Sequence, residues 1–347
     1  MEFSYAYHLP EEYIAKRPAT PRDSSKLFVF DTARDEITLD RFSNLGEYIP
    51  PHSLLVLNNT KVVPARTILK KETGGKVEVL FLVNEWRNGG AIPAIVDRKI
   101  TVGATVSLTT NKTFTVTKQN ENIFYLKPNF PAAQLFAALR KRGAMPIPKY
   151  IKDSRMSEAD LRRRYQSVFA SASASVAAPT ASLHLTDRLL AKLAQRGVRQ
   201  TFITLDVGLG TFAPVKDENI MKNKLHEEFL NIPRNAAALI RSCKKDHNPI
   251  VAVGTTVVRA LESQASAIMK ARGPISGTTD IFIHPPYRFA IVDAMITNFH
   301  LPESSLMMLV QAFIAQKGSS KRLTELYEFA MKHVFRFYSF GDAMLIT

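Results

Sequence analysis

The stretch LLVLNNTK, residues 54–61, decides how the chain is divided. Its four apolar residues are typical of a buried strand, and the Asn-Asn-Thr that follows is a turn former that ends the strand. The residues before this strand are too few to enclose a core of their own. We therefore expect the strand to join a sheet built from a later part of the chain.

A β-rich stretch follows directly, from about residue 62 to residue 148. It contains short segments rich in β-branched and aromatic residues, separated by Gly, Asn and Lys turn signals: VEVLFLV (77–83), KITV (99–102), TVSLTT (105–110), TFTVT (113–117) and IFYL (123–126). Strands at such spacing are typical of a small barrel or sandwich. A helical segment at 131–142 and the Pro-Ile-Pro at 146–148 then indicate the crossing back to the first unit.

Beyond this crossing, strand and helix signals alternate. Strand-like segments at 200–205, 250–253 and 290–297 alternate with helical ones at 235–244, 257–270 and 305–316. Such alternation predicts an α/β sheet. We therefore predict an α/β main domain formed by residues 1–64 and 149–347, interrupted by a small inserted β-barrel domain at residues 65–148.

Composition limits the class of protein. A chain of 347 residues with 46% hydrophobic residues is not a fully disordered protein. Its 46 Lys and Arg residues exceed its 31 Asp and Glu residues and give a formal charge of +15, so a polyanion such as nucleic acid is the first partner to consider. Charge alone fits a basic enzyme that never binds a polynucleotide equally well.

Three features of the sequence indicate the cellular compartment and whether the chain crosses a membrane. Cys243 is the single cysteine, so no intramolecular disulfide can form. Residues 1–20 lack the apolar stretch of a signal peptide, and together these features predict a cytoplasmic protein. The longest apolar run, residues 306–315, is about half the roughly 20 residues that span a bilayer. We interpret it as a core helix and expect no membrane partner.

Two segments in the second half of the chain could bind a ligand next to the backbone. The first, SVAAPTASLHLT at 175–186, combines small residues, a proline and hydroxyl groups before His184. A tight turn in which the histidine satisfies a local hydrogen bond explains it as well. The second, DVGLGTF at 206–212, comes directly after a strand and contains Asp206 and two glycines. Its backbone amides could therefore approach an anion or a planar base. An ordinary turn is again the alternative.

Two further segments end strands. In VGTTVVRALE (253–262) a helix begins at the threonines, so its free amides could hold a carboxylate or phosphate, with Arg259 one turn further on as a forked donor. A helix cap and a surface arginine are equally good explanations. DAMITNFHLP (293–302) places Asn298 and His300 at the end of a strand, where open α/β sheets bind ligands.

The sequence contains no motif that indicates a metal site or a catalytic serine. The eight histidines show no closely spaced ligand pair, and neither an HExxH helix nor a cysteine cluster is present, so we predict no metal. No GxSxG elbow supports a serine triad. Residues 140–164 hold nine Lys or Arg residues against three acids, with Tyr150 among them and Tyr165 directly after Arg164. This surface could contact a nucleic-acid backbone, although a solvated charged face is the alternative.

These four segments, in this order, resemble the S-adenosylmethionine:tRNA ribosyltransferase-isomerase family of queuosine biosynthesis. The likeness spans nearly the whole chain and includes Arg17-Pro18, PRDSSKL (21–27), LNNTKVVPAR (57–66), GGKVEVL (74–80), MPIP (145–148), Tyr150-Ile151, RYQ (164–166) and YSFGDAMLI (338–346). Three positions depart from the family pattern, because Ala174, Ser182 and Leu185 stand where Gly, Gly and Phe are expected.

The resemblance implies an α/β domain interrupted by a β-barrel and a defined reaction. S-adenosylmethionine is consumed as the ribosyl donor. Its ribosyl moiety is transferred to 7-aminomethyl-7-deazaguanine at the tRNA wobble position and isomerised to give epoxyqueuosine, while adenine and methionine leave. A tRNA with this base is the implied partner, and we favour a monomer. The alternatives are a divergent tRNA-binding paralogue without turnover and an S-adenosylmethionine enzyme with another substrate.

The resemblance also suggests roles for particular residues. The candidates for proton transfer, whose individual roles stay open, are His184, Asp206 and His300. Gly208, Gly210 and Thr211 are expected near the adenosine, and Thr255, Thr256 and Arg259 near the methionine carboxylate or a tRNA phosphate. The residues expected to bind RNA are Arg140, Lys141, Arg142, Lys149 and Arg164.

Overall fold

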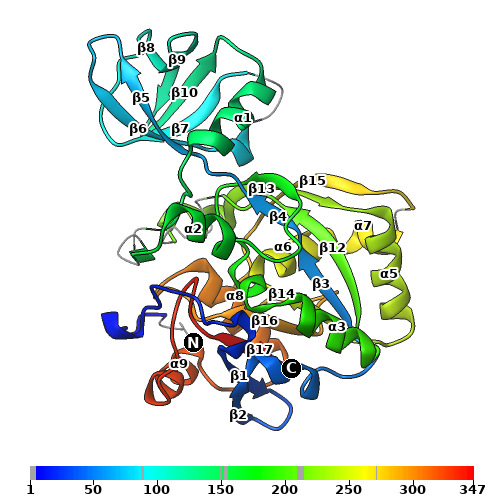
Figure 1. Ribbon diagram of the computed structural model, residues 1–347. Coiled ribbons are helices and arrows are strands. Elements are labelled where there is room, and N and C mark those ends of the chain that lie inside the picture. Colours follow the sequence, from blue (N-terminus) through cyan, green and yellow to red (C-terminus); the bar gives the residue numbers. More distant parts are fainter. Residues whose placement is uncertain (1–4, 87–89, 149, 152–154, 209–214, 271) are drawn as a thin grey trace.

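A computed structural model describes residues 5–86, 90–148, 150–151, 155–208, 215–270 and 272–347. A large sheet with helices on both faces forms the main body, and a smaller barrel lies at one end of it (Figure 1). The predicted fold class, an α/β domain interrupted by a small β-barrel, is confirmed.

The main sheet has nine strands in the order β15-β13-β12-β3-β14-β16-β17-β1-β2. In chain order these are β1 (Lys26–Asp31), β2 (Glu36–Arg41), β3 (Leu54–Asn58), β12 (Arg199–Leu205), β13 (Lys224–Ile232), β14 (Ile250–Val253), β15 (Ile275–Ile281), β16 (Ala294–Asn298) and β17 (Ala343–Ile346). Strand β3, which contains the apolar run at 54–57, lies between β12 and β14 and runs parallel to both, with Leu54 opposite Arg199 and Ile250. Early and late parts of the chain therefore share one sheet.

Helices cover both faces of this sheet, which explains why its central strands are continuously apolar. All residues of β3 and β14 are buried, as expected for parallel strands covered on both sides. The helices are α3 (Asp187–Gln195), α4 (Asp217–Lys222), α5 (Arg234–Lys245), α6 (Thr255–Ser263), α7 (Ala265–Lys270), α8 (Ser305–Gln316) and α9 (Leu323–Lys332). Of the predicted helices, 257–270 is broken at Gln264 into α6 and α7.

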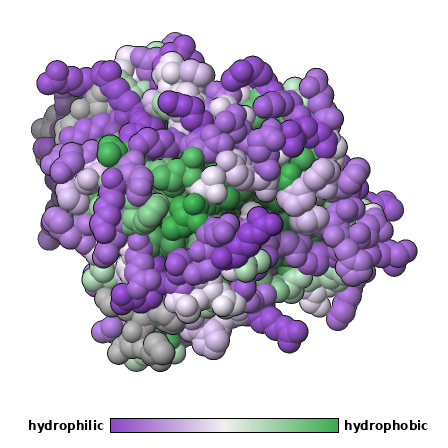
Figure 2. Space-filling model, turned by 90° about the horizontal axis from the view of Figure 1, so that it is seen from below, coloured by the Kyte–Doolittle hydropathy of each residue, from purple (hydrophilic) through white to green (hydrophobic). Residues whose placement is uncertain are grey.

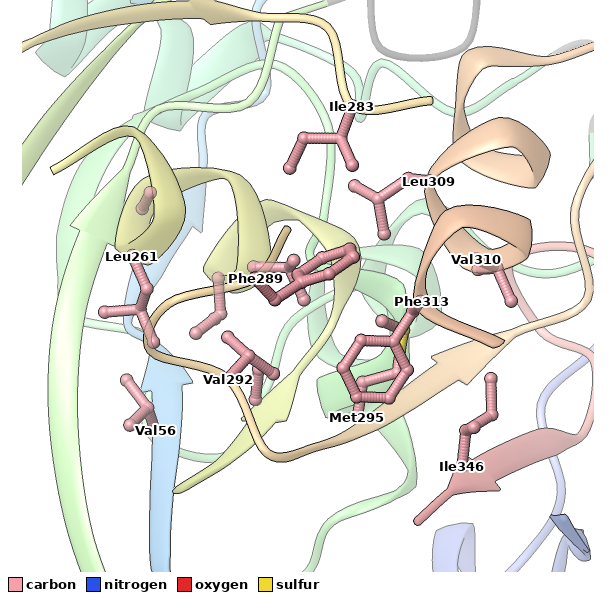
Figure 3. Close-up of a cluster of buried hydrophobic side chains, with 14 of the residues drawn as sticks. Val56, Leu261, Ile283, Phe289, Val292, Met295, Leu309, Val310, Phe313 and Ile346 are labelled. Atoms are coloured by element: carbon pink, nitrogen blue, oxygen red, sulfur yellow. The ribbon is translucent and has the colours of Figure 1, made fainter. Parts of the chain in front are cut away.

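The alternation of side chains along β3 assigns each face its core. Leu54 and Val56 pack with α5, α6, α8 and α9, whereas Leu55 and Leu57 pack with α3 and the 3-10 helix at Phe42–Glu47. Figure 3 shows part of the first core, where Val56 and Met295 of the sheet face Leu261 of α6 and Phe313 of α8. The apolar run at 306–315 lies within α8, whose side chains are mostly buried, so its interpretation as a core helix is confirmed.

The inserted unit is a closed antiparallel barrel. Its strands are β5 (Arg66–Lys71), β6 (Lys76–Phe81), β7 (Ile92–Val96), β8 (Thr105–Thr109), β9 (Lys112–Asn120) and β10 (Ile123–Pro128), in the order β10-β7-β6-β5-β8-β9. Helix α1 (Ala132–Arg142) packs on its core through Leu135 and Leu139.

One strand prediction in the barrel was wrong. The segment KITV at 99–102 is a loop, in which Ile100 is buried in the barrel core while Val102 is half exposed. The strand in this region is β7, which contains Pro93 opposite Tyr125 of β10. The alternating pattern of KITV therefore does not mark a strand. It arises because Ile100 anchors a loop in the barrel core.

The two units are joined by a tight crossing. Arg66 and Ala144 pair as an isolated antiparallel bridge, and a side chain on Gly143 would place its β-carbon 1.9 Å from the carbonyl oxygen of Pro64. Helix α2 (Glu158–Arg164) braces this crossing, because the Glu158 carboxylate accepts a hydrogen bond from the Met145 N–H at 3.0 Å. A short sheet of β4 (Thr60–Val62) and β11 (Ala172–Ser175) lies beside it.

Figure 2 shows the face of the molecule that points away from the barrel. Hydrophilic residues cover most of it, with hydrophobic residues visible at its middle. Within the described part of the chain, none of the helices has the length and apolar character needed to cross a membrane.

Candidate active site

The carboxyl ends of four parallel strands meet at one edge of the main sheet. Strands β12, β3, β14 and β16 are neighbours and run in the same direction, so their last residues lie side by side. Just at or beyond these ends stand Asn58, Asp206, Gly254 and Asn298. The edge of an open α/β sheet at this position is where ligands usually bind.

Two adjoining hollows lie at this edge. The first, called here the threonine hollow, is lined by Ala178, Pro179, Thr180, Ala181, Gly254, Thr255, Thr256, Thr297, Asn298, His300 and Leu306. The second, the tyrosine hollow, is lined by Tyr150, Thr180, Asn298, Phe299, His300, Leu301, Ser304, Leu306, Tyr338 and Ser339. Thr180, Asn298 and His300 line both hollows, and the threonine hollow adds Thr255 and Thr256, so three of the four sequence segments meet here.

Asn298 is the hydrogen-bonding centre of this region. Its amide oxygen accepts from the Thr180 hydroxyl at 3.0 Å, and its amide nitrogen donates to Nε2 of His184 at 3.3 Å and to the Tyr338 carbonyl at 3.3 Å. Only 3% of Asn298 is exposed. Its orientation is therefore fixed from three sides of the site.

His184 is placed behind Asn298 and does not line either hollow. Since Nε2 accepts from Asn298, Nδ1 carries the proton and donates to the Ser25 hydroxyl at 2.8 Å. The ring lies 5.1 Å from that of Phe42, and burial lowers the pKa of His184 to about 4. A neutral imidazole with both nitrogens bonded holds the Asn298 amide in place.

His300 lines both hollows and is also neutral. The Tyr327 hydroxyl accepts from the His300 backbone N–H at 3.1 Å and lies 3.2 Å from Nδ1. Nε2 lies 3.1 Å from the Thr297 hydroxyl. Burial lowers the pKa of His300 to about 3. The side chain thus presents an uncharged ring to the hollows.

The threonines at the start of α6 lie on the wall of the threonine hollow. Gly254 precedes them with a φ of 94°, a conformation that glycine adopts readily. Thr255 and Thr256 are 6% and 5% exposed, and the Asn58 amide lies 3.5 Å from the Thr256 hydroxyl. The first N–H groups of a helix have no acceptor within it, so this end of α6 offers donors to an anion.

Asp206 belongs to a polar network on the barrel side of the same edge. The Thr60 hydroxyl lies 3.4 Å from its carboxylate and 2.7 Å from the Ser175 hydroxyl, which in turn accepts from the Val207 N–H at 2.7 Å. Asp206 is 6% exposed and lines a separate hollow over β13 and β15. Its carboxylate is therefore not among the groups that line the threonine and tyrosine hollows.

Arg259 points into the protein, where it meets a residue that the sequence analysis missed. Its guanidinium forms an ion pair with Glu228 of β13, and its Nε–H donates to the Ile281 carbonyl at 3.4 Å. The other Glu228 oxygen accepts from the Gly208 N–H at 3.1 Å. Glu228 shares the inward face of β13 with Leu230 and Ile232. A carboxylate at an inward position of this alternating apolar pattern was the sequence feature that could have identified Glu228.

The predicted RNA-binding residues divide between the two units. Arg140, Lys141 and Arg142 are exposed at the end of α1, beside the barrel. Arg164 ends α2 in the main body and donates to the Thr20 hydroxyl at 2.9 Å. Lys149, like Gly210 and Thr211 of the predicted adenosine turn, lies outside the described residues.

The departures from the family pattern cause no backbone strain where they are described. Ser182 lies in the 3-10 helix Thr180–His184 and is not among the described residues with positive φ, so its β-carbon is tolerated. Leu185 is fully buried in the core formed with α3. The side chain of Ala174 lies outside the described part. Among described residues, no group of three or more His, Cys, Asp or Glu side chains could hold a metal ion.

Known proteins of one family match this chain along nearly its whole length. The family model described as "Queuosine biosynthesis protein" matches residues 3–346. Two curated relatives named S-adenosylmethionine:tRNA ribosyltransferase-isomerase, from Sulfurihydrogenibium sp. (strain YO3AOP1) and Thermoanaerobacter sp. (strain X514), are each 42% identical, with 99% of this chain and 98% of the relative covered. The crystal structure of S-adenosylmethionine tRNA ribosyltransferase from Thermotoga maritima is 31% identical, with a TM-score of 0.56 and 99% of both chains covered.

Proposed function

Because this chain belongs to the queuosine biosynthesis family, we propose that it is an S-adenosylmethionine:tRNA ribosyltransferase-isomerase. It transfers the ribosyl moiety of S-adenosylmethionine to the aminomethyl group of 7-aminomethyl-7-deazaguanine at the tRNA wobble position. It then isomerises this moiety, giving epoxyqueuosine with release of adenine and methionine. S-adenosylmethionine is thus a substrate of the reaction.

The observation that carries this proposal is the meeting of three sequence segments at the threonine and tyrosine hollows. Thr180, the start of α6 and His300 come from separate parts of the chain and line the threonine hollow together. The hollow offers hydroxyls, helix amides and an uncharged imidazole at the edge of the sheet where α/β proteins bind nucleotides. These groups suit a substrate with a carboxylate, a ribose and a base.

The reaction needs a base for the proton on the carbon next to the sulfonium, and a group that assists the departure of adenine. His300 is our first candidate for proton transfer because its neutral ring lines both hollows. Asp206 is the second, just beyond the end of β12 at the same edge of the sheet. His184 takes part through Asn298, whose amide it holds, and is a positioning residue in this proposal.

The methionine carboxylate binds at the amide groups of Thr255 and Thr256 in this proposal. A helix N-terminus favours an anion through its free N–H groups and its dipole. Arg259, one turn along α6, is paired with Glu228, so its charge is compensated there and the backbone amides of the helix end supply the attraction. Gly208, Gly210 and Thr211 remain the predicted neighbours of the adenosine.

The remaining assignments concern the surroundings of the reaction. Arg140, Lys141, Arg142, Lys149 and Arg164 contact the tRNA backbone, with an affinity that falls as salt rises. We place the enzyme in the cytoplasm as a monomer, and keep the domain boundaries at residues 65 and 148.

The test is incubation of the purified protein with S-adenosylmethionine and an anticodon stem-loop that carries 7-aminomethyl-7-deazaguanine. Mass spectrometry of the nucleosides and an assay for free adenine follow the reaction. Epoxyqueuosine together with adenine release is the expected result. Binding of the stem-loop without either product would replace this proposal by the non-catalytic binder, and adenine release without RNA would favour a small-molecule substrate.

Single-turnover rates then separate the histidines. His300→Gln removes a ring on the hollow wall and should lower the rate of adenine release much more than the affinity for S-adenosylmethionine. His184→Gln should act less strongly, because a glutamine amide can still bond Asn298. His226→Gln, an exposed histidine on β13, is the matched control and should leave both quantities unchanged. An unchanged rate for His300→Gln would remove His300 from the chemistry.

A further inference from the structure

Another hollow, outside the threonine and tyrosine hollows, is lined by arginines. Its wall includes Arg17, Thr20, Arg155, Asp160 and Arg164, and we call it the arginine hollow. Two of these arginines come from distant parts of the sequence, Arg17 from the N-terminal segment and Arg164 from the end of α2. The fold thus gathers positive charge that the sequence keeps apart.

The described residues that line the arginine hollow include three arginines and one acid. Its one acid, Asp160, accepts hydrogen bonds from the Ser157 hydroxyl at 2.9 Å and from Arg163 at 2.6 Å. Next to it, Arg22 donates to the Arg163 carbonyl at 2.7 Å, and its pKa is lowered first by burial and then by the guanidinium groups of Arg164 and Arg163. Like charges held this close repel each other, and an anion in the hollow would relieve that repulsion.

Two chain segments place the arginine hollow close to the candidate site. Tyr150 lines the tyrosine hollow and Arg155 the arginine hollow, and the five Cα-to-Cα steps between them span at most about 18 Å. On the other side, the Arg17 carbonyl accepts from Arg336 at 3.3 Å, two residues before Tyr338 of the tyrosine hollow. An RNA strand with one nucleotide at the candidate site can therefore reach the arginine hollow within a few nucleotides.

We propose that the arginine hollow binds a backbone phosphate of the tRNA strand whose modified nucleotide enters the candidate site. Guanidinium groups bind phosphate oxygens with paired N–H donors, and the Thr20 hydroxyl adds a further polar group at this wall. The inference rests on the proposed function and deepens it, since it names Arg17 and Arg155 as phosphate contacts together with Arg164. Such a contact positions the strand without reading its sequence.

The test is the salt dependence of RNA binding for Arg155→Gln/Arg164→Gln. The probe is the anticodon stem-loop with 7-aminomethyl-7-deazaguanine, and its affinity is measured between 50 and 200 mM salt. Losing one phosphate contact should lower the slope of log K against log salt by a little less than one, so that the affinity loss over this range shrinks about threefold. Far-ultraviolet circular dichroism checks that the variant is folded.

Lys245→Gln/Lys270→Gln is the matched control, because it removes two exposed charges on α5 and α7, on the opposite side of the main body from α2 (Figure 1). Its slope should equal that of the unmodified protein. An unchanged slope in the arginine variant, or an equal change in both variants, would overturn the phosphate site. Adenine release by the unmodified protein is measured on the same RNA, so failure of the proposed function is seen separately.

Discussion

Glu228 and Arg259 form an ion pair in which the two side chains are only 2% and 3% exposed. The second Glu228 oxygen accepts from the backbone N–H of Gly208, at the start of the turn predicted to meet the adenosine. One carboxylate therefore links α6, which borders the threonine hollow, to the end of strand β12. A buried charge pair of this kind is costly to break, because removal of one partner leaves the other charge without compensation.

Glu228→Gln should therefore destabilise the protein by about 3–5 kcal/mol, although the amide oxygen can still accept from Gly208. The free energy of unfolding from a urea titration measures this loss. In the double variant Glu228→Gln/Arg259→Met no charge is left buried, and much of the lost stability should return. A double variant less stable than Glu228→Gln would contradict the view that the unpaired guanidinium causes the loss.

Gly208 also links the barrel to the candidate site. A β-carbon on Gly208 would lie 2.9 Å from the side-chain nitrogen of Asn84, a buried residue of the barrel in the 3-10 helix Val83–Glu85. Gly208→Ala should therefore displace one of the two residues and lower the rate of adenine release, with a loss of stability of about 1–3 kcal/mol typical of overpacking.

Asn84→Ala removes the atom that the new β-carbon meets. If the clash is the cause, Asn84→Ala/Gly208→Ala should turn over faster than Gly208→Ala, and a double-mutant cycle should show coupling between the two positions. Additive effects would mean that Gly208 is required for a reason other than its contact with Asn84.

Local patterns predicted much of the main domain, because its central strands are buried on both faces. The run at 54–57 and the run at 250–253 are continuously apolar, and each is a strand of the sheet. The strands of the barrel were harder to predict from local sequence patterns. Strand β7 contains Pro93, which argues against a strand in a local pattern, whereas its pairing with β6 and β10 is fixed by closure of the barrel.

The site was predictable as a set of segments but not as a set of contacts. Asp206, Asn298 and His300 could be predicted as site residues because each lies at or just after the end of a strand. Parallel strands bring such residues to one edge of the sheet. That Nδ1 of His184 meets Ser25, 159 positions away, depends on the packing of the segment before β1 and has no local signal. Arg259 was expected to face the ligand, and its partner on β13 could not be inferred from α6 alone.

The two buried histidines predict a loss of stability in mild acid. In the unfolded chain a histidine has a pKa near 6.5, while burial lowers the pKa of His184 to about 4 and that of His300 to about 3. At a pH between the folded and unfolded pKa values, the unfolded chain binds more protons than the folded chain. The free energy of unfolding is therefore highest above about pH 6.5 and decreases as the pH falls below it. At pH 5 each histidine should cost of the order of 2 kcal/mol.

Urea titrations at pH 7.5 and pH 5 measure this dependence. His184→Gln/His300→Gln has no imidazole at either position, so the difference in stability between the two pH values should be smaller by several kcal/mol. The absolute stability of the variant does not enter this comparison. An equal difference in both proteins would show that these histidines are protonated as easily in the folded chain as in the unfolded one.

Gly143 offers a test of the crossing between the two units. Because Gly143 has no side chain, two backbone carbonyl groups can approach it closely. A β-carbon there would lie 1.9 Å from the Pro64 oxygen and 2.6 Å from the Leu139 oxygen. Neither atom can move without shifting the strand that enters the barrel or the last turn of α1. Gly143→Ala should therefore lower the free energy of unfolding by about 3 kcal/mol or more, at the upper end of overpacking effects.

Gly273→Ala is the matched control for this substitution. Nothing lies within 4 Å of the β-carbon that it adds, so the change in stability should stay within about 0.5 kcal/mol. Because the crossing sets where the barrel sits relative to the candidate site, Gly143→Ala should also raise the KM for the stem-loop, whereas Gly273→Ala should not. If both variants unfold and bind RNA like the unmodified protein, the close approach of Gly143 and Pro64 does not fix the two units.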